Sequence, residues 1–271
     1  MTAQELFQSG RLDEAVAAQI AQVKQNPSDV DARYALFVYF CFSGELDRAS
    51  AALQVVASRA DKAEGSALLL ASLLAAEHER RAVWTEGGTP LYAPDPPAHL
   101  LARLRVLESL RAGDAESAGK ALDDAIEAFV QTAYVLDRAP IEVLRDADDR
   151  LGSVLELFVG GRYVWIPFER IERLTLTPPK NALDLLWLPA QLEDVSGTSS
   201  SVYVPALYEG SHAGFDEGVR LGRKTLWIDQ GADIHRGVGQ RMLLAASGEE
   251  EREVPILELR SLVAAARAAH A

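Results

Sequence analysis

Gly10-Arg-Leu-Asp-Glu-Ala15 recurs as Gly44-Glu-Leu-Asp-Arg-Ala49, and this repeated hexapeptide decides the fold that we predict for the first half of the chain. The two copies begin 34 residues apart. A weaker third copy, Gly113-Asp-Ala-Glu-Ser-Ala118, follows after close to two further periods. A fixed period of this length is typical of proteins in which pairs of antiparallel helices stack on one another.

The chemistry of the hexapeptide fits a tight turn between two helices. Gly10 and Gly44 can end one helix in the left-handed conformation without steric cost, because glycine has no Cβ. Asp13 and Asp47 then lie at the start of the next helix, where a carboxylate suits the unpaired N–H groups. Together with the period, these positions predict tetratricopeptide-like units that form a short solenoid with a concave side.

The rest of the first half extends this helical prediction, with one interruption. Apolar side chains recur at helical spacing, and Cys41 falls within that pattern, so we interpret it as a packed small hydrophobe. A Gly/Pro-rich stretch at 85–97 predicts an exposed loop, after which helices resume over 99–111 and 115–134. We therefore predict six or seven helices, stacked in one helical repeat domain over residues 1–140.

The second half has a different pattern, which predicts strands. Val154–Val159 and Arg162–Ile166 flank Gly160-Gly161, as expected of two strands joined by a tight turn. The fold class is therefore α+β: an N-terminal tetratricopeptide-like α-helical repeat domain, followed by a C-terminal β-rich α+β domain over residues 150–271. Further strands are predicted at 173–177, 183–192, 201–207, 224–229 and 241–246, with a charged break at 249–253 and a closing helix at 255–269.

Composition excludes several classes of protein. With 40 acidic and 27 basic residues the formal net charge is −13, and an acidic surface repels phosphate backbones, so we expect no nucleic-acid partner. A single cysteine excludes an intrachain disulfide framework and fits a reducing compartment. The N-terminus lacks a secretory pattern, and no apolar run is long enough to span a bilayer. We expect a cytoplasmic protein with protein partners and no membrane insertion.

No pattern in the chain predicts a catalytic residue, a cofactor or a metal ion. The five histidines form no metal-binding pair, and the chain has no phosphate-binding glycine loop or nucleophile elbow. Asp229, Asp233 and His235 cluster in the sequence and could hold a metal or act as acid and base. A polar loop explains the same three residues.

Three other residues of the second half are candidates for contact with a partner protein. Arg220 and Arg223, followed by Trp227, could pair with and stack on an acidic partner. An arginine pair on a solvated hairpin is the alternative interpretation. Neither interpretation is favoured by the residues themselves.

The second half also carries an ordered series of short motifs. They are G-R-Y-x-W-x-P at Gly161–Pro167, D-L-L-W-x-P-A at Asp184–Ala190, V-x-x-P-A-L-Y-x-G-S at Val202–Ser211, R-L-G-R-x-T-x-W at Arg220–Trp227 and G-Q-R at Gly239–Arg241. Each motif alone is a weak signal. As an ordered set behind a helical repeat, they resemble the ImpE/TagJ family, accessory proteins of bacterial type VI secretion systems.

The resemblance implies a non-enzymatic role. Proteins of this family are associated with the contractile sheath, where they bind a helical segment of the small sheath subunit TssB and work alongside the ATPase ClpV. By this resemblance we expect a TssB-like helix as partner, and a ClpV-like ATPase as a further one. Two other functions stay open: a tetratricopeptide chaperone for another client, and an enzyme or small-ligand binder with its site near Arg220, Asp229 and His235.

Tetratricopeptide geometry suggests where a partner helix would bind. The first helix of each pair lines the concave side, and in the second repeat that helix runs from about Val30 to Ser43. Tyr34, Val38 and Phe42 should face the groove and are the candidates for partner contact. Packing of the same three residues against a neighbouring helix or the second half is the alternative.

Overall fold

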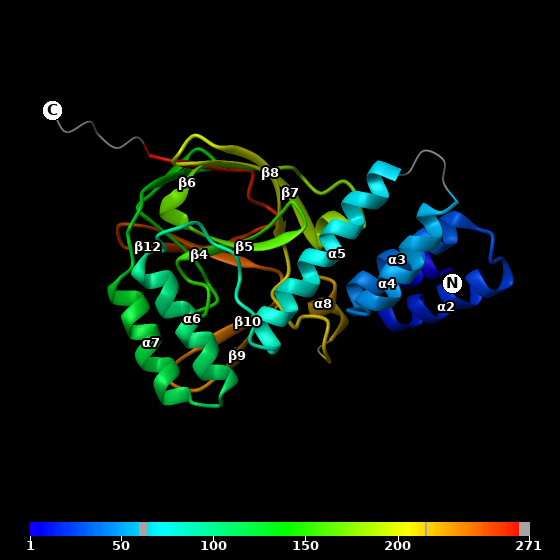
Figure 1. Ribbon diagram of the computed structural model, residues 1–271, viewed down its shortest axis with the longest axis horizontal. Coiled ribbons are helices and arrows are strands. Elements are labelled where there is room, and N and C mark those ends of the chain that lie inside the picture. Colours follow the sequence, from blue (N-terminus) through cyan, green and yellow to red (C-terminus); the bar gives the residue numbers. More distant parts are fainter. Residues whose placement is uncertain (60–63, 215, 266–271) are drawn as a thin grey trace.

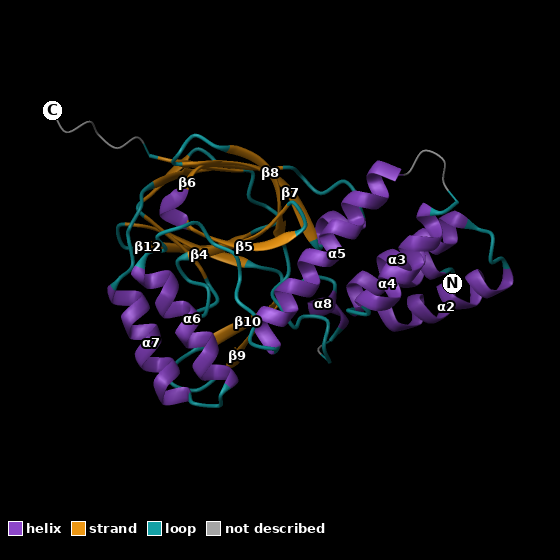
Figure 2. Ribbon diagram, in the orientation of Figure 1, coloured by secondary structure: helices purple, strands orange, loops and turns teal. Residues whose placement is uncertain are grey.

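The computed structural model describes residues 1–59, 64–214 and 216–265. Its helices lie mainly in the first half of the chain and its strands in the second (Figures 1 and 2). The helices are α1 (Ala3–Gln8), α2 (Leu12–Gln25), α3 (Val30–Ser43), α4 (Leu46–Ala57), α5 (Glu64–Thr85), α6 (Ala98–Arg111), α7 (Ala115–Glu127) and the short α8 (Glu217–Arg220).

Helices α1 to α4 form the predicted repeat, each packing against the next along the chain. The turns between the helices of each pair contain Gly10 and Gly44, both in the left-handed conformation with φ of 88° and 78°. Asp29 precedes α3 and its side chain accepts a hydrogen bond from the Ala32 N–H at 2.9 Å, which caps the helix. The local signals for paired helices are therefore confirmed.

The period predicted that the stack would continue through all the helices, but in the structure it does not. Helix α5 packs against α4 on one side and against the sheet on the other, and α6 and α7 then pair with each other beside Ile234 of the second half. The proline-rich loop explains the departure, because Leu91 exchanges backbone hydrogen bonds of 3.0 and 2.8 Å with Tyr163 and Trp165. This contact directs the chain away from the repeat before α6 begins.

The strands form three antiparallel sheets in the described part of the chain. The largest has the order β2-β1-β13-β6-β7-β8-β4-β5, and the smaller ones are β12-β11-β3 and β10-β9. The strands are β1 (Tyr134–Leu136), β2 (Ala139–Ile141), β3 (Val143–Asp146), β4 (Val154–Val159), β5 (Arg162–Pro167), β6 (Ile171–Leu176), β7 (Trp187–Asp194), β8 (Ser199–Pro205), β9 (Thr225–Asp229), β10 (His235–Gly239), β11 (Met242–Ser247), β12 (Glu250–Pro255) and β13 (Ser261–Ala264).

Several sequence-based boundaries differ from the structure. Strands begin at Tyr134, within the range predicted to be helical, and the charged stretch predicted as a break is β12. Strand β12 lies at the edge of its sheet, which lets its glutamates face solvent while its backbone pairs with β11. In place of a closing helix, β13 inserts between β1 and β6; residues 266–269 of that predicted helix lie outside the described residues.

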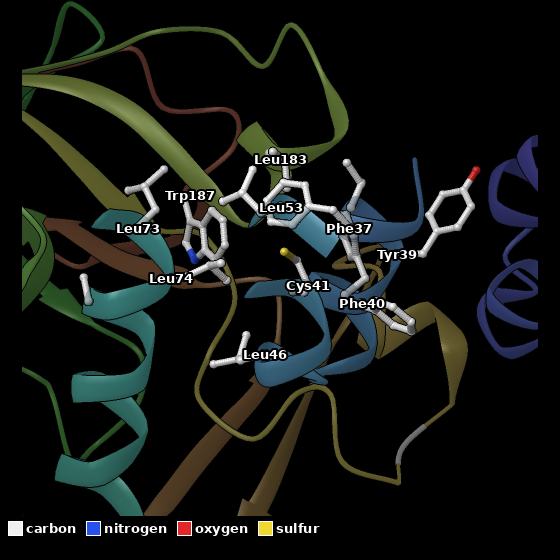
Figure 3. Packing of buried hydrophobic residues seen from close by; sticks show 14 of the residues in the cluster. Phe37, Tyr39, Phe40, Cys41, Leu46, Leu53, Leu73, Leu74, Leu183 and Trp187 are labelled. Atoms are coloured by element: carbon white, nitrogen blue, oxygen red, sulfur yellow. The ribbon is translucent and has the colours of Figure 1, made fainter. Parts of the chain in front are cut away.

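One apolar core joins the two halves. Leu183, in the 3-10 turn η2 (Ala182–Leu185), and Trp187 of β7 lie against the repeat at Phe37, Cys41 and neighbouring side chains (Figure 3). Burial raises the pKa of the Cys41 thiol well above its usual range, as expected of a packed small hydrophobe. None of the helices in the described residues is both long and apolar enough to cross a membrane.

Candidate functional site

A groove of about 670 Å³ opens between α1 and α3, on the side of the repeat where a partner helix was expected. Its wall from α1 includes Phe7, and its wall from α3 includes Tyr34, Ala35 and Val38. Ala182 of η2 closes one end of it. The groove is therefore built by the repeat, and the second half borders it.

The three residues predicted to face this groove differ in their exposure and their contacts. Tyr34 is 39% exposed at the groove and lies 5.8 Å, centroid to centroid, from Phe37. Val38 lines the groove with 7% of its surface exposed. Phe42 is only 1% exposed and packs edge-on against Phe7. Phe42 is thus a core residue, as the alternative interpretation held, because the ring completes the contact between α1 and α3.

The groove has an apolar floor and polar edges. Phe7 and Tyr39 stack with ring centroids 4.8 Å apart, which fixes α1 against α3 at this point. Polar side chains border the apolar strip. They are Gln4 and Gln8 of α1, Gln22 of α2, and Asp29 and Asp31 at the start of α3. Gln19 of α2 also lines the groove but is buried, and its amide donates to the Ala32 carbonyl oxygen at 2.8 Å. This arrangement suits one apolar face of an amphipathic helix.

Arg220 and Arg223 lie at the junction of the two halves. The Arg220 guanidinium pairs with the Asp13 carboxylate of α2, with Nη1 and Oδ1 2.8 Å apart. Arg223 Nη2 donates to the carbonyl oxygen of Gln8 at the end of α1, at 2.9 Å. Both arginines therefore contact the N-terminal helices of their own chain. Arg220 is largely covered in this position, with 11% of its side chain exposed, whereas Arg223 stays on the surface.

Trp227 stays on the surface, 39% exposed, on the ribbon formed by β9 and β10. Its ring lies 5.9 Å from that of Tyr208 in a tilted arrangement. The alternative predicted from the sequence was a catalytic or metal site that included Asp229 and His235. These two residues are paired across the same ribbon. Arg220 is held apart from them by Asp13. Among the described residues, no group of three potential metal ligands comes together.

A buried network of charged side chains joins α5 to the sheets, and the sequence analysis missed it. Arg241 is fully buried and pairs with Asp146, with Nη1 and Oδ2 2.5 Å apart, and with Glu156. Arg80 of α5 donates to the same Glu156 at 2.8 and 3.1 Å. One signal was available: Glu156 interrupts the apolar run Val154–Val159, and a charge there requires a buried partner.

The electrostatics of this network act in opposite directions on its two carboxylates. Burial alone would raise the pKa of Glu156, but the charges of Arg80 and Arg241 hold it well below its usual range. Burial raises the pKa of Asp146 to about 6, opposed by Arg241. Removing one partner of such a buried pair typically costs about 3–5 kcal/mol. The network therefore holds α5 against the sheets.

Comparison with known proteins agrees with this structure. The sequence model of the ImpE protein family matches residues 138–263. A crystal structure of a Vibrio parahaemolyticus protein superimposes with a TM-score of 0.89, at 21% identity and over 97% of each chain, which shows the same fold. The type VI secretion system accessory component TagJ of Pseudomonas aeruginosa is 34% identical over 262 residues, covering 97% of this chain and 90% of TagJ. The chain therefore belongs to the ImpE/TagJ family.

Proposed function

We propose that this protein is a non-enzymatic, cytoplasmic accessory component of a type VI secretion system. In this proposal the groove between α1 and α3 binds a helical segment of a TssB-like small sheath subunit, and the protein links that subunit to a ClpV-like ATPase. Similarity to TagJ over nearly the whole chain supports the secretion role. The groove supports binding of a helix.

The observation that carries the proposal is the exposed Tyr34 above an apolar strip of small side chains. Ala35 and Val38 have small side chains, so the backbone of a bound helix can approach α3 closely. An aromatic residue at the edge of such a strip is the kind of anchor that dominates binding energy. A helix about 10 Å across, laid along α3, would contact these three residues with its apolar face.

The test is calorimetric binding of a helical peptide taken from the small sheath subunit of the same organism. Tyr34→Ala should weaken binding about tenfold or more, because truncating an aromatic anchor removes over about 1.4 kcal/mol. Ala35→Arg should abolish binding by filling the groove with a long charged side chain. Leu101→Ala is the matched control, since Leu101 on α6 is also 39% exposed but lies outside the groove.

Each variant is first checked by thermal unfolding, because a change at Ala35 can also disturb α3. Unchanged affinity in a folded Ala35→Arg variant would exclude the groove as the binding surface. The link to the ATPase is tested separately, by co-sedimentation of a ClpV-like ATPase with sheath protein in the presence and absence of this protein. Equal recovery of the ATPase in both samples would contradict the linking role.

A further inference from the structure

A second pocket, of about 340 Å³, lies between the α6–α7 hairpin and strand β3. It is remote in sequence from the groove of the repeat, and none of its lining residues belongs to α1, α2 or α3. One end carries the charged groups and the wall beside it is apolar. The charged end, called the cationic end below, is formed by Arg103 and Arg145 with the Asp149 carboxylate also in the lining, and the apolar wall by Leu122, Ile126, Phe129 and Val143.

Arg103 is held rigidly at the cationic end. Its side chain is buried, its Nε donates to Ser153 Oγ at 2.9 Å, and its Nη1 donates to the carbonyl oxygen of Asp149. Ser153 Oγ in turn lies 2.7 Å from Nδ1 of His99, whose Nε2 is 2.6 Å from the Glu169 carboxylate. This chain of hydrogen bonds fixes the guanidinium before any ligand arrives.

The Nη2 group of Arg103 takes no part in these hydrogen bonds. Within the described residues it donates no hydrogen bond, although Nε and Nη1 of the same group are both engaged. Gly152, with a φ of 43°, lies directly against the guanidinium, and a Cβ at this position would collide with Nη2. The backbone is thus shaped to let the charged group reach the pocket.

The guanidinium of Arg103 keeps its positive charge at neutral pH. Burial lowers the pKa of Arg103 to about 10, and the charges of Asp149, Asp146 and Asp148 oppose that shift without cancelling it. Arg145 is paired loosely, with Nη1 3.7 Å from Asp149 Oδ1, and its side chain is 39% exposed. Since Asp149 is shared between its neighbours, an additional anion would find uncompensated donors here.

We propose that this pocket binds a small amphiphilic carboxylate. The carboxylate would accept hydrogen bonds from Arg103 Nη2 and from Arg145, and a short apolar chain would lie along Leu122, Phe129 and Val143. The volume is at the lower end of the range for ligand pockets, which fits a chain of a few carbons better than a long lipid. A free short-chain acid and the C-terminal residue of a peptide share this chemistry.

The test is calorimetric titration of the full-length protein with octanoate and with N-acetyl-Gly-Leu, which carries a free C-terminal carboxylate. We expect saturable binding of at least one of them, and the tighter probe identifies the source of the ligand. Octanol, which has the tail without the charge, and acetate, which has the charge without the tail, should each bind at least about tenfold more weakly. Equal binding of octanol and octanoate would show that the cationic end does not bind the carboxylate.

Substitutions in the pocket test whether a loss of binding comes from the site itself or from a general loss of stability. Arg145→Gln should weaken the tighter probe about tenfold without unfolding the protein, because the side chain is on the surface. Val143→Trp fills the apolar wall and should remove binding while leaving the Arg103 hydrogen bonds intact. Arg105→Met on the same helix is the control, since Arg105 pairs with Asp124 outside the pocket. Undiminished binding in both pocket variants would overturn the proposal.

Discussion

His212 is a residue at which burial and nearby charges shift a pKa in the same direction. It lines a cavity of about 40 Å³ with Arg81 and Arg220, between the repeat and the second half. Burial, together with the nearby positive charges of Arg81, Arg80 and Arg220, lowers the pKa of His212 to about 4. The imidazole is therefore neutral in the folded protein at neutral pH.

The shift predicts a pH dependence of stability. Below about pH 6.5 the unfolded chain protonates His212 while the folded chain does not, so the free energy of unfolding falls as pH drops from 6.5 towards 4. Well above pH 6.5 His212 is neutral in both the folded and the unfolded chain, so its protonation no longer lowers the free energy of unfolding. Because the side chain is partly exposed and solvent screens its charge, we expect the loss to amount to roughly 1–2 kcal/mol.

Denaturant unfolding of the wild type and of His212→Gln at pH 7 and pH 4.5 checks this prediction. The difference between the two proteins isolates His212 from Glu77 and Glu209, which line the same cavity. Burial raises the pKa of Glu209, which gives it the opposite slope, since its folded form holds a proton longer as pH rises. Parallel pH profiles in both proteins would show that His212 is not the titrating group.

At the scale of elements, the turns of the repeat are also the places where α5 and the second half contact the repeat. The carbonyl oxygen of Gly44 accepts a hydrogen bond from Arg81 Nη1 at 2.7 Å, and the ring of His212 lies directly against the Gly44 Cα. Arg223 takes the equivalent position at the Gly10 turn. The third turn, at Gly113, has the same left-handed backbone but open space around it.

This difference predicts unequal effects of the same substitution. Both Gly44→Ala and Gly113→Ala force a left-handed alanine, which costs about 1 kcal/mol each. Gly44→Ala should cost a further 1–3 kcal/mol or so, because its methyl group collides with the His212 ring. The measurement is the free energy of unfolding in urea. The double variant Gly44→Ala/His212→Ala should recover most of the extra loss; equal losses in the two single variants would disprove the contact.

At the scale of the whole molecule, the repeat and the β-rich half share a core. Leu183 and Trp187 of the second half pack among apolar side chains of α3, α4 and α5, as Figure 3 shows. The buried network adds a second connection, because Arg80 of α5 binds Glu156 of β4. Two parts joined in this way should unfold together and not in sequence.

Leu183→Ala tests that expectation. The substitution should lower the free energy of unfolding by about 2–5 kcal/mol, since Leu183 is 6% exposed in the shared core. Far-UV circular dichroism, which reports mostly the helices, and tryptophan fluorescence, which reports the junction, should give coincident transitions in both proteins. Helices that unfold at lower denaturant than the tryptophan signal in the wild type would contradict a shared core.

Local sequence signals predicted the parts of the fold that depend on neighbouring residues. Gly10 and Gly44 end their helices as expected, and Gly160-Gly161 joins two paired strands. The prediction of a closing helix was wrong for the described residues. The alanine-rich sequence suits a helix locally, but β1 and β6 offer backbone hydrogen-bond partners to a strand between them. In the candidate site, Tyr34 and Val38 line the groove, whereas Phe42 is buried by α1.

The sequence by itself determined the helical repeat, the β-rich second half and the family, because these follow from local turns, periodicity and ordered motifs. Only the tertiary structure decided that the arginines of the R-L-G-R motif bind the repeat's own helices, and that Arg241 meets Glu156 and Asp146 in the interior. Such pairings join residues up to 215 positions apart. Nothing in the local chemistry of either partner specifies the other, so only the packed chain brings them together.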